Sequence, residues 1–210
     1  MARKRRSPRS VQGLEMLSRV RLSTHFFLRD FLYSEVAAIH GIANIPDDPD
    51  LAIAAGTALC EQLLEPLVSA FGPIALRSGY RSPALNRFCN ENRYNCARNE
   101  VSVAGHIWDR RDEQGGMGAM VTVVVPWFIP QYEQSGDWRP LAWWIHDHLP
   151  YSEMCFFPKL AAFNLGWREY PLREIRSFAA PKKGLLTKPG MPGHDADHST
   201  LYPGFPKEPN

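Results

Sequence analysis

Apolar residues recur at helical spacing between Pro49 and Phe71, and this stretch carries the strongest helix signal in the chain. The turn at residues 44–50 supplies carboxylates suited to a helix start, and Gly72-Pro73 is a helix-ending pair. We therefore predict one long helix whose apolar face is buried. The residues sharing that face are Ile53, Leu59, Leu63, Leu64, Leu67 and Val68.

Short β-branched runs follow the long helix. Residues 74–78 predict a strand, and Ala119 to Val125 predict a core strand that Pro126 ends. Two shorter strands are expected at Met154 to Phe157 and at Phe163 to Trp167. Helices that precede short strands, and then alternate with them, indicate an α+β fold.

Further helices are expected at 83–92 and at 138–148, while the charged, Gly-rich residues 109–118 predict an exposed loop. A short helix near Leu22 to Leu32, capped by Ser23 or Thr24, would carry Phe27, Phe31 and Leu32 inward.

The two ends differ in composition from the middle of the chain. Residues 1–21 form a basic arm, and residues 181–210 form a Pro-rich tail that is extended and either wraps the domain or hangs free. The arm either contacts phosphates or an acidic partner, or is a solvated, disordered terminus. Its basic residues are Arg3, Lys4, Arg5, Arg6 and Arg9.

Composition narrows the function classes. The chain has 210 residues, of which 44% are hydrophobic, which suits one compact domain at residues 22–180. Its formal net charge of +2 argues against nucleic acid as the main partner, except through the basic arm. No apolar run follows the basic start, so we expect no signal peptide, no membrane span and a cytoplasmic location. Release from the cell by a route that needs no signal peptide fits equally well.

The four cysteines predict reduced thiols. No CxxC or Cys/His zinc spacing is present. Cys60 and Cys155 are expected in the core, whereas Cys89 and Cys96 are near enough in sequence to pair or to share a metal.

Several motifs occur in an order that resembles the zinc D-Ala-D-Ala carboxypeptidase and murein endopeptidase family, in the small subgroup shared with phage endolysins. The resemblance covers roughly residues 22–180 and implies a carboxypeptidase (hedgehog-type) domain, with a small, mostly antiparallel sheet and helices packed on one side. The motifs are residues 22–31, Pro46-Asp47-Asp48-Pro49, Leu64-Glu65-Pro66-Leu67, Ser78-Gly79-Tyr80-Arg81-Ser82-Pro83, Trp143-Trp144-Ile145 and Leu149-Pro150-Tyr151.

The same resemblance implies a site, because that family binds one zinc through His, Asp and a second His, with a Glu as general base. Arg81 matches the arginine that holds substrate or the developing oxyanion, and His106 matches the first ligand. The Asp position falls on Thr122, the Glu position near Phe157 and the second His position near Asn164. None of these three side chains performs that chemistry, so the zinc site is expected to be lost or rebuilt.

A rebuilt site has candidate ligands in the charged loop. His106, Asp109 and Asp112 lie close in sequence, Glu113 adds another oxygen donor, and such a set binds zinc or a harder divalent cation. The alternative is that Asp109-Arg110-Arg111-Asp112 is a solvated, self-paired loop.

Two other histidine clusters are weaker candidates. His146 and His148 flank Asp147, but side chains two residues apart on a helix point to different faces. His194 and His198 have helical spacing within the Pro-rich tail, where they either hold a metal or are merely polar. Aromatic residues between 127 and 167 are explained by core packing, or in part by an aromatic wall beside Arg81 that suits a peptide or glycan.

Three functions therefore remain open. The first is a metallopeptidase that cleaves cell-wall peptides through a rebuilt metal site, with zinc as cofactor. The second is a catalytically degenerate descendant that binds a peptide, a cell-wall fragment or a protein around Arg81. The third is a structural component of an assembly, attached through its arm and tail. Whether the chain is an enzyme stays undecided at this point.

Overall fold

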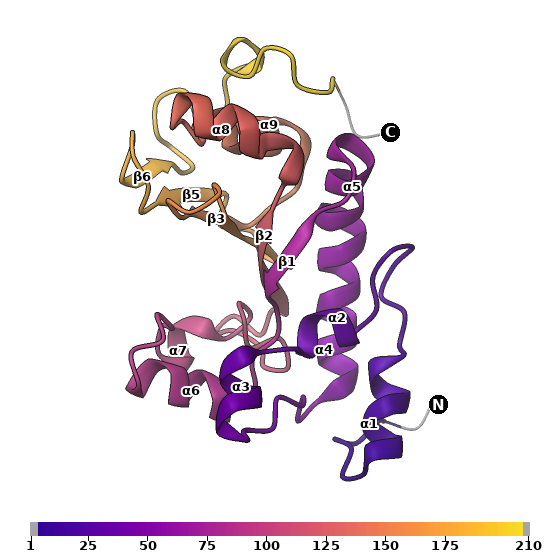
Figure 1. The fold of residues 1–210 in the computed structure, drawn as a ribbon. Helices are drawn as coiled ribbons and strands as arrows, with labels where there is room; N and C mark the ends of the chain where they lie inside the picture. The colour runs from indigo at the N-terminus through magenta and orange to yellow at the C-terminus, as the bar shows by residue number, and fades with distance from the viewer. Residues whose placement is uncertain (1–3, 208–210) are drawn as a thin grey trace.

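The computed structural model describes residues 4–207, which form an α+β fold around a six-stranded sheet (Figure 1). The strand order is β1-β2-β4-β3-β5-β6, and neighbours are antiparallel except β3 and β5, which are parallel. The predicted α+β class and mostly antiparallel sheet are thus confirmed. The strands are β1 (Ala75–Ser78), β2 (Gly118–Val124), β3 (Glu153–Phe156), β4 (Phe163–Arg168), β5 (Glu174–Ser177) and β6 (Gly184–Thr187).

The predicted long helix is confirmed and consists of α4 (Pro49–Leu59), a π-helical segment η1 (Cys60–Leu64) and α5 (Glu65–Phe71). Asp48 caps its start by accepting a hydrogen bond from the amide of Leu51. The face of α4 that includes Ala52 and Leu59 is fully buried and lies against β2 and β4. The mean hydropathy of 1.3 over this helix would also suit a membrane span, which is weak evidence because core helices share that property.

The sheet has one apolar face and one polar face, because side chains alternate along each strand. Val121, Val123 and Leu165 are fully buried on the side of the long helix. Between them, Thr122 and Asn164 point to the opposite side and are only partly buried. That polar side, flanked by α6 (Pro83–Glu91) and α7 (Asn99–Ser102), carries the cleft described below.

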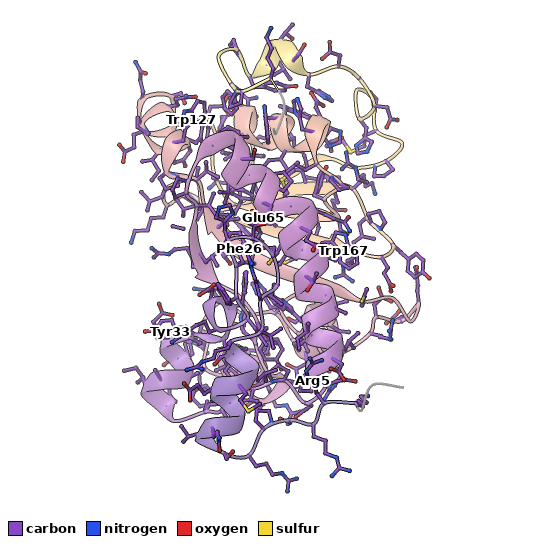
Figure 2. All side chains as sticks on the ribbon, turned by 90° about the vertical axis from the view of Figure 1, so that its right-hand side faces the viewer. Arg5, Phe26, Tyr33, Glu65, Trp127 and Trp167 are labelled. Atoms are coloured by element: carbon purple, nitrogen blue, oxygen red, sulfur yellow. The ribbon has the colours of Figure 1, made fainter. Side chains whose placement is uncertain are left out.

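The segment before the long helix holds three short helices, where the sequence predicted one near Leu22 to Leu32. It contains α1 (Val11–Ser18), α2 (Arg29–Leu32) and α3 (Glu35–His40). Phe31 is fully buried as expected, but Phe27 is 40% exposed, so its predicted inward position is wrong. Ser23 caps no helix, because its hydroxyl donates to Glu65 on the long helix at 2.6 Å. Figure 2 shows Phe26 and Glu65 close to this junction.

The described part of the basic arm is docked on the domain. Lys4 contacts Asp48 and Arg5 contacts Asp50, each at 2.8 Å, and Figure 2 places Arg5 beside the lower end of the long helix. From Lys4 onward, the interpretation as a free, disordered terminus is therefore replaced by an arm paired with the start of α4. Arg3 lies outside the described residues.

The Pro-rich tail wraps the domain rather than hanging free. It leaves β6 and crosses α9 (Arg139–His148), which follows η2 (Pro126–Phe128) and α8 (Ile129–Ser135). It then forms η3 (Ser199–Leu201) and ends where Trp144 donates to the carbonyl of Pro206 at 2.7 Å. Figure 1 shows this segment passing over α8 and α9.

Gly79 joins the N-terminal segment to the cleft. A Cβ at this position would lie 2.8 Å from the Cα and the carbonyl oxygen of Phe31, closer than such contacts occur. Beside it, the amide of Tyr80 donates to the Phe31 carbonyl at 3.0 Å, and the Gly79 carbonyl accepts from His106. Only glycine allows this approach of two backbone segments.

Gly79→Ala is expected to destabilise the protein by about 1–3 kcal/mol, because the added methyl group must push the backbone at Phe31 away. Urea unfolding of the wild type and the variant measures this difference. An unchanged free energy of unfolding would show that the close approach carries no structural role.

Candidate functional site

A cleft of about 670 Å³ opens on the polar side of the sheet. We call it the Arg81 cleft. It is bounded by the loop after α6, by the segment around His106 and by strands β2, β3 and β4. The side chains that determine its chemistry are Arg81, Cys96, His106, Cys155, Phe157 and Asn164.

The guanidinium of Arg81 has neutral or sulfur partners. Nη1 donates to Asn86 Oδ1 at 3.1 Å and to Cys96 Sγ at 3.0 Å, and Nη2 donates to Ser78 Oγ at 3.5 Å. Within residues 4–207, Arg81 forms no ion pair with a carboxylate. Burial lowers the pKa of Arg81. The site thus holds a partly desolvated cation without an anionic partner.

His106 presents a free acceptor to the same cleft. Its Nδ1 lies 2.8 Å from the carbonyl of Gly79, an acceptor, so Nδ1 carries the proton. The ring is only 6% exposed, and Nε2 has no hydrogen-bond partner among the described residues. Burial, and then the nearby charge of Arg81, lower the His106 pKa to about 3. Near neutral pH the ring is therefore uncharged, with a buried Nε2 lone pair.

The strands bring together the remaining positions implied by the resemblance. Thr122 on β2 pairs with Asn164 on β4, and the Thr122 hydroxyl donates to Asn164 Oδ1 at 2.7 Å. Asn164 also lies close enough to interact with His106, and Phe157 lines the same cleft. A zinc site of the family type does not fit these residues, because His106 Nε2 is accompanied by a hydroxyl, an amide and a phenyl ring. In the described chain, His106 belongs to no group of three potential metal ligands.

The loop carboxylates do not join His106. Asp109 accepts from the amide of Asp47 at 2.7 Å, and only 2% of Asp109 is exposed. Burial raises its pKa. Asp112 accepts from the amide of Gly116 at 2.8 Å and lies 3.7 Å from Arg168. Each carboxylate thus holds its own part of the chain, and the structure does not assemble His106, Asp109 and Asp112 as one ligand set.

Two thiols, Cys96 and Cys155, line the cleft, and neither was predicted there from the sequence. Cys155 was expected in the core, but it lies on the polar side of β3, is only partly buried and is therefore corrected to a cleft residue. The alternation of Met154, Cys155 and Phe156 along the strand was the available signal. Cys96 reaches the cleft from the loop after α6, beside Arg81. Cys60 is fully buried, as predicted.

An aromatic wall beside Arg81 is present, but tryptophans do not form it. The rings of Phe157 and Phe178 stack with centroids 5.9 Å apart, and both residues line the cleft. Phe178 is 65% exposed, whereas Trp138 and Trp144 are fully buried in the core. The cleft therefore combines a cation, a buried imidazole acceptor and an exposed apolar wall.

A second polar cluster, the tail latch, ties the C-terminal tail to α9. The group His146, Asp147 and His198 could hold a metal ion, because one possible ligand atom of each lies within 4.8 Å of the others. Spacing along the sequence groups His146 with His148 and His194 with His198, so it does not predict that His146, Asp147 and His198 come together. The wrapped tail brings His198 to Asp147, which no local spacing reveals.

Protein groups already saturate the latch. His198 Nδ1 lies 2.7 Å from Asp147 Oδ1, and its Nε2 lies 2.8 Å from the carbonyl of Gly193. The same ring stacks on Trp143 with centroids 3.9 Å apart. Tyr202 donates to Asp147 Oδ2 at 2.7 Å. His146 has Tyr151 OH at 2.6 Å on one ring nitrogen and the His194 carbonyl at 2.7 Å on the other.

Acid should destabilise the protein partly through His106. In the folded state the pKa of His106 is lowered from 6.5 to about 3. Between these two values the imidazole is protonated in the unfolded chain but neutral in the folded protein. Stability is then lost as the pH falls from 6.5 towards 3, by up to about 1.4 kcal/mol per pH unit.

His106→Gln removes this titration, and thermal unfolding between pH 7 and pH 4 should show a shallower loss for the variant than for the wild type. Parallel curves for the two proteins would contradict the buried, neutral assignment of His106.

Asp147→Ala should cost about 1–3 kcal/mol of stability, because it leaves His198 and Tyr202 without their carboxylate acceptor. The matched control is Asp195→Ala in the same tail, whose side chain is 94% exposed; a change within about 0.5 kcal/mol is expected there. Chemical unfolding of both variants measures the difference, and equal effects would rule out the latch.

Comparisons with protein-family models, with curated proteins and with solved structures found no match for this chain.

Proposed function

We propose that this chain is a D-Ala-D-Ala carboxypeptidase-like domain of peptidoglycan-peptidase type that has lost zinc catalysis and binds a ligand with a free carboxylate. The ligand class is a peptide or cell-wall fragment, held in the Arg81 cleft. The family assignment rests on the motif order in the sequence, and the α+β fold agrees with it. The binding role rests on the chemistry of the cleft.

One observation carries the proposal: Arg81 has no anionic partner among residues 4–207. A partly buried guanidinium without a carboxylate is costly to the folded state, so such a group is retained where a ligand supplies the negative charge. Glu153 lines the same cleft, but it is engaged by Arg168 at 3.1 Å. A carboxylate matches the planar fork of donors that an arginine presents.

The neighbouring groups favour a peptide terminus over an isolated anion. His106 Nε2 can accept a hydrogen bond from a ligand. The last amide N–H of a peptide belongs to the same residue as its free carboxylate, so one ligand residue offers both groups. Phe157 and Phe178 offer an apolar surface for the adjoining side chains. The cleft therefore suits a carboxylate, an N–H group and an apolar flank in close succession.

Catalysis of the zinc peptidase type is not supported by the residues. A zinc needs negatively charged or imidazole ligands and an adjacent general base, but Thr122, Asn164 and Phe157 supply none of these. The alternative of an active metallopeptidase with a rebuilt site needs Asp109 and Asp112 beside His106, and both carboxylates are engaged elsewhere. We therefore favour the binding role.

The tail latch is a second candidate zinc site, because its two imidazoles and one carboxylate are a typical set of zinc ligands. Zinc would have to displace the hydrogen bonds that His146 and His198 already make. We therefore propose that the latch works without an ion, as a structural tie between the tail and α9.

Binding of N-acetyl-D-alanyl-D-alanine, measured by calorimetry, is expected for the wild type. Its C-terminal amide should bind at least about tenfold more weakly, because the charged hydrogen bonds to Arg81 are lost. Arg81→Gln should remove the difference between acid and amide, and the dipeptide should remain uncleaved with zinc added.

Arg111→Gln is the control, since Arg111 is an exposed arginine outside the Arg81 cleft. Equal affinity of acid and amide in the wild type would contradict carboxylate binding. Release of D-alanine in the presence of zinc would instead establish the peptidase alternative.

A further inference from the structure

Cys96 is fixed beside both Arg81 and the helix that carries Cys89. The side-chain amide of Asn90 (Nδ2) donates to the Cys96 carbonyl at 2.7 Å, so the residue next to Cys89 anchors the Cys96 backbone. The chain between them folds back on the helix, with the Tyr94 amide donating to the Cys89 carbonyl at 2.8 Å. Both thiols are free.

The two thiols lie close enough to interact, and they differ in access to solvent. Cys96 is partly exposed and lines the Arg81 cleft, whereas Cys89 is only 3% exposed on α6. Burial, and then the charge and hydrogen bond of Cys96, raise the pKa of Cys89 to about 11. Cys96 is therefore the thiol that a reagent from solution meets first, and Cys89 is the buried neighbour behind it.

We propose that Cys89 and Cys96 form a redox-active dithiol pair, which a low-molecular-weight disulfide such as oxidised glutathione converts to an intramolecular disulfide. We propose further that this disulfide strengthens anion binding by Arg81, a second step that rests on the proposed carboxylate-binding function.

The exchange balances with the disulfide reagent as oxidant. The Cys96 thiolate attacks one sulfur of the reagent, the reagent S–S bond breaks, and one thiolate leaves with the electron pair of that bond. Cys89 loses its proton to water and attacks the Cys96 sulfur of the mixed disulfide, which expels the second thiolate. The leaving thiolates take up protons, so two electrons and two protons pass from the cysteine pair to the reagent.

The link to Arg81 is the hydrogen bond between its Nη1 and Cys96 Sγ, at 3.0 Å. In the reduced protein this sulfur competes with a ligand for that N–H donor. In the disulfide the sulfur is drawn to Cys89 on α6 and is a poorer acceptor, so the donor faces the cleft. Oxidation therefore increases the number of guanidinium N–H groups available to a carboxylate.

The pair is tested by incubating the folded protein with oxidised glutathione, blocking the remaining thiols and mapping peptides by mass spectrometry. A Cys89–Cys96 cross-link is expected, with Cys60 and Cys155 still free. Cys89→Ser should stop at one glutathione adduct on Cys96, and Cys155→Ser, the matched control from the same cleft, should still form the cross-link. A glutathione adduct that stays on Cys96 of the wild type, or a first reaction at Cys155, would overturn the proposed dithiol pair. Peptide mapping of the wild-type protein is sufficient for this conclusion, even if a variant folds poorly.

The coupling is tested separately by calorimetry with N-acetyl-D-alanyl-D-alanine on the reduced and cross-linked proteins. At least about threefold tighter binding by the cross-linked form is expected, and reduction with dithiothreitol should reverse it. Equal affinities would overturn the coupling while the dithiol pair stands. Absence of binding by both forms would overturn the coupling and the proposed carboxylate-binding function together, and leave the cross-link result unaffected.

Discussion

The antiparallel pairing of β2 with β4 is the constraint on which the rest of the structure depends. Its register sets Val121 opposite Leu165 on the apolar side and Thr122 opposite Asn164 on the polar side. A slip of one residue would exchange the two faces of a strand, because side chains alternate with period two. The long helix requires the apolar face and the cleft requires the polar one, so core and site are specified by the same set of hydrogen bonds.

Two buried groups in the cleft are left without the partners that folding normally provides. Within the part of the chain that the structure describes, Arg81 has a desolvated charge with no carboxylate partner, and His106 has a buried nitrogen with no donor. Other titratable groups find partners within the chain: Glu65 accepts from both the amide and the ring of His25, and Asp147 accepts from His198 and Tyr202. Asp109 Oδ1 and Arg168 Nε are also buried without a hydrogen-bond partner among the described residues, but neither residue lines the Arg81 cleft. Arg81 and His106 line one cleft, and this is where an external ligand would contribute.

Sequence patterns predict those parts of the fold that are locally determined. The long helix follows from apolar spacing and its Asp48 start, and β2 follows from its β-branched run. Strands β5 and β6 have four residues each and depend on pairing with β3 and with each other, so no local signal marks them. Phe27 was misplaced because the segment around it is held by Glu65 and not by a helix of its own.

The candidate site was predictable only where its residues lie in local sequence motifs. Arg81 and His106 lie in motifs, and the structure places both in one cleft with Asn164 and Phe157. Asp109 was misjudged as an exposed ligand because its charge run gives no sign that the carboxylate turns inward to the amide of Asp47. The approach of His198 to Asp147 depends on the path of the tail over α9, which becomes visible only in three dimensions.

The most direct test is a crystal structure of the protein soaked with N-acetyl-D-alanyl-D-alanine and zinc, with anomalous data collected at the zinc edge. The account predicts the ligand carboxylate on the Arg81 guanidinium, a ligand N–H at His106 Nε2 and no anomalous peak in the cleft. A zinc ion bound to His106, with the dipeptide cleaved or absent from Arg81, would contradict it.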